Sequence, residues 1–369
     1  MSLLAIDILT FTRLLAILAA RPAKIMQDIG DQIVNAALAW PTQPPINKID
    51  THHHFVPEFY AEIVEQAGGD PSGWPTPRWS AEQSIKVMDK LGVSAAVLSV
   101  TAPGACILTG EASYDLARRL NLEAATHRQR SPSRFAMFAS LPSLLDTDAA
   151  LEEIRFALDE LHADGVTVFT RYGNQHTYLG HPDLEPIWAE LNRRKCVVFV
   201  HPTHPVDTNP VNSKMPQPMI DYPHETTRAA MDMILQRTCI KYPDCKVILS
   251  HAGGSLPYII SRISVPLEAV PGPVASFKIG VNHREVVESF RSFYYDLALS
   301  SSPAVIRLLL DQVPNDHILY GSDFPYAPLP AYPAFLKHLE GFNMDSETRR
   351  KINFKNARAI LPGLPSAHL

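Results

Sequence analysis

Eight short apolar runs recur along the chain, and amphipathic helical patterns separate them. The runs lie at 46–53, 95–100, 134–141, 165–171, 196–202, 246–253, 293–299 and 317–325. Several are apolar without alternation, as in Val197–Val200, which is typical of parallel strands covered on both faces. Eight strands that alternate with helices predict a (β/α)8 barrel of the TIM type. Helices are expected at 81–91, 111–129, 147–163, 183–195 and 224–240.

The first 45 residues precede the first predicted strand and carry a different pattern. Apolar residues at helical spacing predict one or two amphipathic helices within 2–38. Asp7 and Arg13 interrupt the apolar run, which argues against a signal peptide and against a transmembrane segment. We therefore predict an N-terminal helical extension and linker at 1–45, followed by a barrel domain at 46–369. The helices are expected to cover the barrel or a partner subunit, with peripheral membrane contact as the alternative.

Composition narrows the possible partners. The net charge is -5 and no cluster of lysine and arginine stands out, so nucleic acid is not an expected partner. The four cysteines show no CxxC spacing, which favours free thiols in a reducing compartment and a cytoplasmic protein. The 46% hydrophobic content is ordinary for a globular enzyme.

Histidine and aspartate residues lie where the predicted strands end. His52 and His54 are two residues apart at the end of the first strand, so their side chains point the same way. His201, His251 and Asp323 end the fifth, sixth and eighth strands. The carboxyl ends of barrel strands meet at one mouth, where these folds hold their active sites. Imidazoles and one carboxylate suit Zn2+, with Mn2+ or another divalent ion possible.

A structural interpretation exists for each of these histidines. A single histidine near a strand end is more often a hydrogen-bonded core residue than a metal ligand. Four histidines and an aspartate at the same end of their strands are difficult to explain by packing alone. The middle histidine, His53, is expected to point away from the site because its neighbours point into it.

Six motifs occur in order along the chain: "IDTHHHFVP", "MDKLGVSAAVLS", "VFVHP", "ILSHAGGSLPY", "YGSDFPY" and "NFKNARAIL". Together they resemble the amidohydrolase-related decarboxylases, a family typified by aminocarboxymuconate semialdehyde decarboxylase. The resemblance covers about residues 46–362. It implies a barrel of the metal-dependent amidohydrolase superfamily without an organic cofactor. It makes His52, His54, His201 and Asp323 metal ligands, and His251 a histidine that interacts with metal-bound water or substrate.

The resemblance also implies a homodimer. Arg262 matches an arginine that reaches a neighbouring subunit's active site in this family. A surface arginine on a helix is the equally supported alternative.

Two reactions are open to such a site. Decarboxylation of an aromatic ortho-hydroxy acid requires a proton at the ring carbon that carries the carboxylate, and we assign its delivery to Asp323, directly or through bound water, with His251 assisting. A metal-dependent hydrolase or lactonase with the same ligands is the alternative. A catalytically inactive scaffold is disfavoured because no ligand is missing.

Long loops after the first and fifth strands, at 55–80 and 202–223, are expected to form rigid walls of the substrate pocket, since the second contains six prolines. Aromatic residues crowd the strand ends and suit a flat ring, although packing explains some of them: Phe55, Trp79, Tyr258, Phe324 and Tyr326. Arg171 ends the fourth strand and could bind a carboxylate at two points, with a structural ion pair as the alternative.

The first ligand motif separates subgroups of the family. The γ-resorcylate and dihydroxybenzoate decarboxylases have a glutamate-type motif there, which this chain lacks. Its "DTHHHFVP", "HPTHP" and "SHAGGSLPY" resemble most the 6-methylsalicylate decarboxylases of fungal polyketide metabolism. The implied reaction converts 6-methylsalicylate to m-cresol and CO2.

Overall fold

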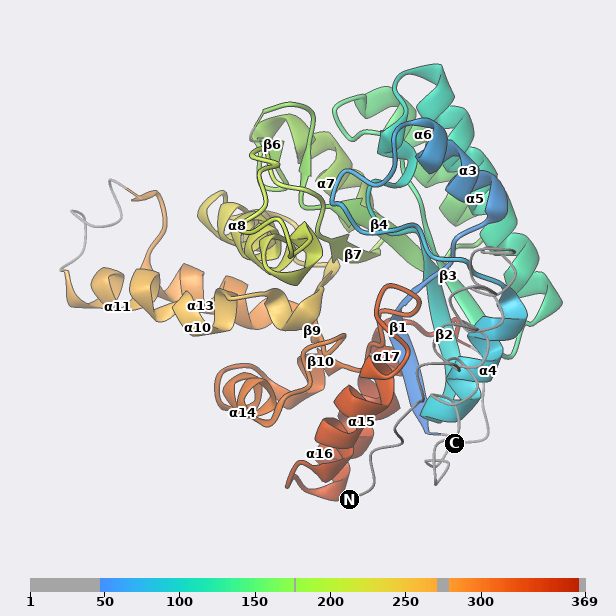
Figure 1. Ribbon diagram of the computed structural model, residues 1–369. Helices are drawn as coiled ribbons and strands as arrows, with labels where there is room; N and C mark the ends of the chain where they lie inside the picture. The colour runs from blue at the N-terminus through green and yellow to red at the C-terminus, as the bar shows by residue number, and fades with distance from the viewer. Residues whose placement is uncertain (1–46, 176, 271–278, 365–369) are drawn as a thin grey trace. The chain divides into compact units, whose positions relative to one another are not determined.

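The computed structural model describes residues 47–175, 177–270 and 279–364, so the helices predicted within 2–38 lie outside it and the domain boundary at residue 45 stays a prediction. Eight parallel strands form one sheet in the order β1-β2-β3-β4-β7-β8-β9-β10 (Figure 1). Their bounds are β1 Lys48–His54, β2 Val93–Ser99, β3 Phe135–Ala139, β4 Gly165–Phe169, β7 Val197–His201, β8 Lys246–Leu249, β9 Tyr294–Asp296 and β10 Ile318–Leu319. All eight predicted strands are confirmed.

The sheet closes on itself between β1 and the segment that follows β10. The Thr51 amide donates to the carbonyl of Tyr320 at 3.0 Å, and the His54 amide donates to that of Phe324 at 2.7 Å. A parallel bridge pairs His53 with Phe324. These contacts complete the predicted (β/α)8 barrel and place the segment of Asp323 beside β1.

All five predicted helices are present, although the α-helix at the predicted 147–163 ends at Arg155, and the structure adds helices at other positions. Their bounds are α3 Glu58–Gln66, α4 Ala81–Leu91, α5 Glu111–Arg130, α6 Thr147–Arg155, α7 Glu185–Arg193, α8 Asp221–Leu235, α9 Thr238–Lys241, α10 Leu256–Ile259, α11 Ser261–Ala269, α13 His283–Ser292, α14 Pro303–Gln312, α15 Ala331–Gly341, α16 Ser346–Arg350 and α17 Asn356–Ile360. The helix predicted at 224–240 divides into α8 and α9 because Arg237 adopts a left-handed conformation with φ 62°. The sequence also did not predict the small antiparallel hairpin of β5 Arg171–Tyr172 and β6 Thr177–Tyr178.

Local signals explain where helices begin and end. Ser80 caps α4 by accepting a hydrogen bond from the Gln83 amide, and Gly92 ends that helix with φ 70°. Asn282 and Glu285 form a capping box at the start of α13. None of the helices within the described ranges is long and apolar enough to cross a bilayer.

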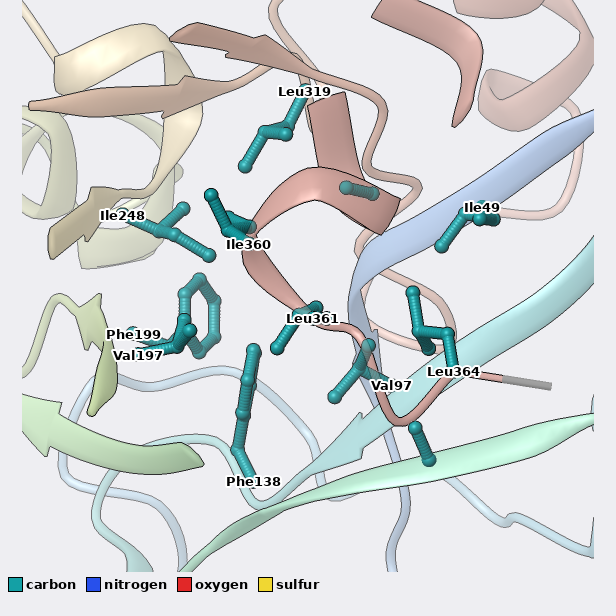
Figure 2. Packing of buried hydrophobic residues seen from close by; sticks show 12 residues of the cluster. Ile49, Val97, Phe138, Val197, Phe199, Ile248, Leu319, Ile360, Leu361 and Leu364 are labelled. Atoms are coloured by element: carbon teal, nitrogen blue, oxygen red, sulfur yellow. The ribbon is translucent and has the colours of Figure 1, made fainter. Parts of the chain in front are cut away.

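A buried apolar cluster, which we call the core cluster, packs between the strands of the barrel (Figure 2). Its members come from the strands and from the last described residues of the chain: Ile49, Val97, Ala136, Phe138, Val197, Phe199, Ile248, Leu319, Ala357, Ile360, Leu361 and Leu364. The rings of Phe138 and Phe199 stack with centroids 5.7 Å apart. The C-terminal segment therefore packs into the barrel as part of its core.

Candidate metal centre and substrate cavity

Three histidines and one aspartate from three strand ends converge at the mouth of the barrel. They are His52, His54, His201 and Asp323, all buried, and one ligand atom from each lies within 4.8 Å of all the others. The Nε2 atoms of His52 and His54 are 3.0 Å apart. Such a set of nitrogen and oxygen donors fits a divalent metal ion. The predicted metal site is confirmed at this level.

Acceptors around the site orient each of the three imidazoles. Every Nδ1 faces a carboxylate or carbonyl oxygen, which can only accept, so the proton lies on Nδ1 and Nε2 offers its lone pair to the metal. His52 Nδ1 donates to Asp296 Oδ2 at 3.0 Å. His54 Nδ1 donates to the Ser99 carbonyl at 3.2 Å, and His201 Nδ1 donates to the Pro202 carbonyl at 2.8 Å.

The fourth ligand, Asp323, is held by an unusual backbone conformation. Its φ is 64°, and its amide donates to the His52 carbonyl at 2.8 Å. Its Oδ1 lies 3.2 Å and 3.1 Å from the Nε2 atoms of His52 and His54. This oxygen is buried and has no hydrogen-bond partner among the described residues. With the imidazole protons on Nδ1, both nearby Nε2 atoms are acceptors, and a buried carboxylate oxygen that faces only acceptors is unfavourable, so the arrangement fits a cation at this point.

The electrostatic field of the site also favours a cation. Burial lowers the pKa of His52, but Asp296 and Asp323 outweigh it and raise that pKa to about 10. Burial lowers the pKa of His201 well below its usual value, so this ring stays neutral and able to bind metal. A divalent ion would replace the proton that the two carboxylates attract to His52.

His251 lies beside the four ligands. Its Nδ1 donates to the Ala298 carbonyl at 3.1 Å, and its Nε2 is 3.9 Å from Asp323 Oδ2. Its backbone is left-handed, with φ 54°, and its amide donates to Asp296 Oδ1 at 3.1 Å. Asp296 therefore positions both His52 and His251. Sequence reasoning missed it, although it is the one acidic residue in the apolar run 293–299.

A cavity of about 240 Å3 opens beside His201, His251 and Asp323. Both long loops contribute to its walls, as predicted. Its other lining residues are Asp70, Ser72, Trp74, Thr101, Pro218, Met219, Tyr222, Pro223, Leu299, Ser300, Tyr326, Ala327, Pro328, Ala331 and Phe335. Sequence reasoning did not single out Asp70, Trp74 or Tyr222 as site residues, because only loop packing turns them toward the metal.

Among the predicted substrate contacts, Tyr326 lines this cavity. Phe55 is buried with its ring centroid 5.9 Å from that of Trp79, which lines a separate groove against α3, α4 and α5. Phe324 packs against His53 and Tyr332, with centroids 5.1 Å and 5.9 Å away. Phe55, Trp79 and Phe324 are therefore not in the cavity wall, because side chains at neighbouring strand ends face different sides of the barrel wall.

The predicted carboxylate-binding arginine has another set of contacts. Arg171 donates from Nε, Nη1 and Nη2 to the carbonyls of His204, Gly173 and Pro205, at 2.9, 2.8 and 3.1 Å. It does not line the cavity, and its side chain fastens the loop after β7. Arg171 Nε also lies 4.0 Å from Glu225 Oε2, which fits the structural ion pair, and binding of a substrate carboxylate stays a prediction.

Two further predicted residues lie on the surface. Arg262 is exposed on α11, and Tyr258 on α10 is 77% exposed. Neither lines the metal-site cavity of its own chain. The contribution of Arg262 to a neighbouring subunit stays a prediction.

Comparisons with known proteins agree with this geometry. A family model described as Amidohydrolase matches residues 49–363. The chain is 47% identical over 320 residues to a 6-methylsalicylic acid decarboxylase from Penicillium expansum, covering 86% of this chain and 97% of that protein. The crystal structure of an amidohydrolase II superposes with a TM-score of 0.77 at 30% identity, covering 85% of this chain and 99% of that chain.

The structure of dihydroxybenzoic acid decarboxylase from Polaromonas, with bound manganese and the inhibitor 2-nitroresorcinol, has the same fold. Its TM-score is 0.74 at 22% identity, and the match covers 86% of this chain and 97% of that chain. The family match, the barrel and the four converging ligands lead to one conclusion: this chain belongs to the amidohydrolase family.

Proposed function

We propose that this protein is a metal-dependent decarboxylase of aromatic ortho-hydroxy acids, and that it converts 6-methylsalicylate to m-cresol and CO2. The observation that carries the proposal is a four-ligand metal site that opens into a small cavity with mostly apolar walls. The relative from Penicillium expansum, matched over nearly its whole length, supports the choice of substrate.

The cavity suits one substituted benzene ring. Its volume of about 240 Å3 accommodates a single ring with small substituents, and Trp74, Tyr222 and Tyr326 supply aromatic surface. A divalent metal held by His52, His54, His201 and Asp323 would supply a Lewis acid for the oxygens of the substrate. The walls then fix the orientation of the ring, which lowers the entropic part of the barrier.

The proposal assigns proton delivery to Asp323, with His251 assisting. In the proposed step, the Asp323 carboxyl transfers a proton to the ring carbon that bears the carboxylate. The bond between this carbon and the carboxylate then breaks, its electron pair restores the aromatic ring, and CO2 leaves. His251 Nε2 faces Asp323 Oδ2 at 3.9 Å, and in its doubly protonated form this ring would return a proton to Asp323 through a bridging water.

The charge of Asp323 must change when substrate binds. Burial raises its pKa, but the neighbouring histidines, His52 first, outweigh burial and hold the pKa well below its usual value. An anionic substrate in the cavity adds negative charge next to this carboxyl and so increases its affinity for a proton. We expect protonation only in the substrate complex.

For the ion itself we propose Zn2+, because three imidazoles and one carboxylate form a donor set that zinc accepts. The bound manganese of the Polaromonas enzyme makes Mn2+ the alternative. Elemental analysis of protein purified without added metal distinguishes the two. We also propose a homodimer with Arg262 at the neighbouring site, which sedimentation and an Arg262→Ala variant test.

Product analysis tests the function. Metal-loaded protein incubated with 6-methylsalicylate should release m-cresol and CO2 in equal amounts, and a chelator should stop the reaction. Asp323→Asn should lower turnover by about 10^2- to 10^4-fold even where metal is retained, because amide nitrogen cannot deliver the proton. Ring opening of lactones without CO2 release from salicylates would replace the decarboxylase with the hydrolase alternative.

A further inference from the structure

The middle histidine of the HHH motif has no part in the site described above, yet it is buried. His53 lies between Asp50 and Ser84, with Nδ1 2.9 Å from Asp50 Oδ2 and Nε2 2.5 Å from Ser84 Oγ. All three side chains are at most 1% exposed. As predicted, His53 therefore points away from the metal ligands on either side of it.

The order serine, histidine, aspartate is that of a hydrolytic triad, but this arrangement has no access to substrate. None of the three side chains lines the metal-site cavity, and their burial excludes a substrate carbonyl from the Ser84 hydroxyl. The role of these three residues therefore depends on the other contacts of Asp50.

The second oxygen of Asp50 connects β1 with the segment after β10, two of the three segments that carry metal ligands. Asp50 Oδ1 accepts from the His52 amide at 3.2 Å and from the Ser322 amide at 3.0 Å. His52 is a ligand on β1, and Ser322 directly precedes the ligand Asp323 after β10. The orientation of one carboxylate therefore determines where both backbone segments lie.

His53 and Ser84 hold that carboxylate from the other side. Since Asp50 Oδ2 can only accept, the His53 Nδ1 carries a proton, and in the neutral ring Nε2 accepts from the Ser84 hydroxyl. Ser84 is in α4, so the chain of contacts runs from a helix outside the barrel to the metal site inside it.

We propose that Asp50, His53 and Ser84 form a positioning network that fixes the spacing of the ligands His52 and Asp323 and so determines metal affinity. The network touches neither metal nor substrate. Loss of outer partners of metal ligands typically weakens metal binding by about 10- to 100-fold. We expect an effect of this size when the contact between His53 and Asp50 is removed.

The test is the dissociation constant of Zn2+, measured by competition with a chromophoric chelator on the otherwise unaltered full chain. His53→Leu should weaken Zn2+ binding by about 10- to 100-fold. His53→Asn, whose amide nitrogen can replace Nδ1 as donor to Asp50, should restore most of the affinity. Ser84→Ala, a milder change that keeps His53, should weaken binding by less than His53→Leu does, at most about tenfold.

Matched controls separate positioning from general loss of stability. His317→Leu removes a half-buried histidine that donates to the Phe293 carbonyl far from the metal ligands, and Ser113→Ala removes a buried serine that donates to the Ala105 carbonyl. Both should lower the melting temperature without changing the Zn2+ dissociation constant. The proposal is overturned if folded Ser84→Ala binds Zn2+ as tightly as wild type and as Ser113→Ala, and if folded His53→Leu also keeps the wild-type affinity. If His53→Leu does not fold, wild-type affinity in both Ser84→Ala and His53→Asn overturns it.

Discussion

The two ends of the barrel interior are built on the same strands with opposite chemistry. On β7, Val197 and Phe199 belong to the core cluster, and His201, two residues further along the same face, is a metal ligand. The ring of Phe199 lies 4.9 Å from that of His52, so the two regions are in contact. Residues on one face of the five-residue strand β7 thus contribute both to the apolar core and to the polar site.

The difference lies in what each region demands of its geometry. Apolar side chains stabilise a core through volume and buried surface, and several can replace one another. Metal ligands must instead meet a distance requirement of tenths of an ångström. Accordingly, Asp323 and His251 have left-handed backbone conformations, whereas no residue of the core cluster does. Among the described residues, seven other than glycine have positive φ, and four of them lie at or beside the metal site: His251, Ala252, Leu299 and Asp323.

The largest effect should come from removing a ligand. His201→Ala should reduce decarboxylation by roughly 10^3-fold, because the Lewis acid is worth several kcal/mol and each 1.36 kcal/mol is tenfold. Metal content and turnover should fall together, while near-ultraviolet circular dichroism stays native. If His201→Ala retains full turnover after dialysis against a chelator, the metal ligands at the barrel mouth are not required for the reaction.

Truncating the ring that joins the two regions should act on stability instead. Phe199→Ala should lower the free energy of unfolding by about 3–5 kcal/mol, because it leaves a cavity in the core cluster. Urea denaturation measures this change. Turnover of the folded Phe199→Ala protein should fall less than tenfold. If this variant also loses its metal, the core cluster and the metal site do not act independently.

The smallest expected effect is a pH dependence of the free energy of unfolding that comes from His204, in the loop after β7. Burial, and then Arg171, lower the pKa of His204 to about 4. Between about pH 6.5, the ordinary pKa of histidine, and about pH 4, His204 binds a proton in the unfolded chain but not in the folded protein. The free energy of unfolding therefore falls as the pH drops through this range. His204→Gln should remove about 1–2 kcal/mol of this loss between about pH 7.5 and pH 5.

A variant of the apolar end provides the comparison for this measurement. Leu361→Ala should destabilise the protein by a similar amount at both pH values, since the core cluster contains no titratable side chain with a shifted pKa. If His204→Gln keeps the pH dependence of the wild type in urea denaturation, the pH sensitivity belongs to other groups.

The metal centre was accessible to sequence reasoning because it depends on local periodicity and on where strands end. Alternation along β1 places His52 and His54 on one face, and the barrel brings the ends of β1, β7 and β10 to one mouth. The cavity wall was less accessible. Of the predicted aromatic contacts only Tyr326 lines it, since the direction of each loop side chain depends on how whole loops pack.

By itself, the sequence of this protein determined the order of strands, the ligand set and the face of β1 that binds metal, because these follow from spacing along one chain. Only the tertiary structure decided that Arg171 holds a loop, that Asp296 orients His52, and that His53 supports the site from behind. The physical reason is that buried polar groups must find partners wherever the fold brings donors and acceptors together, at separations no local pattern encodes.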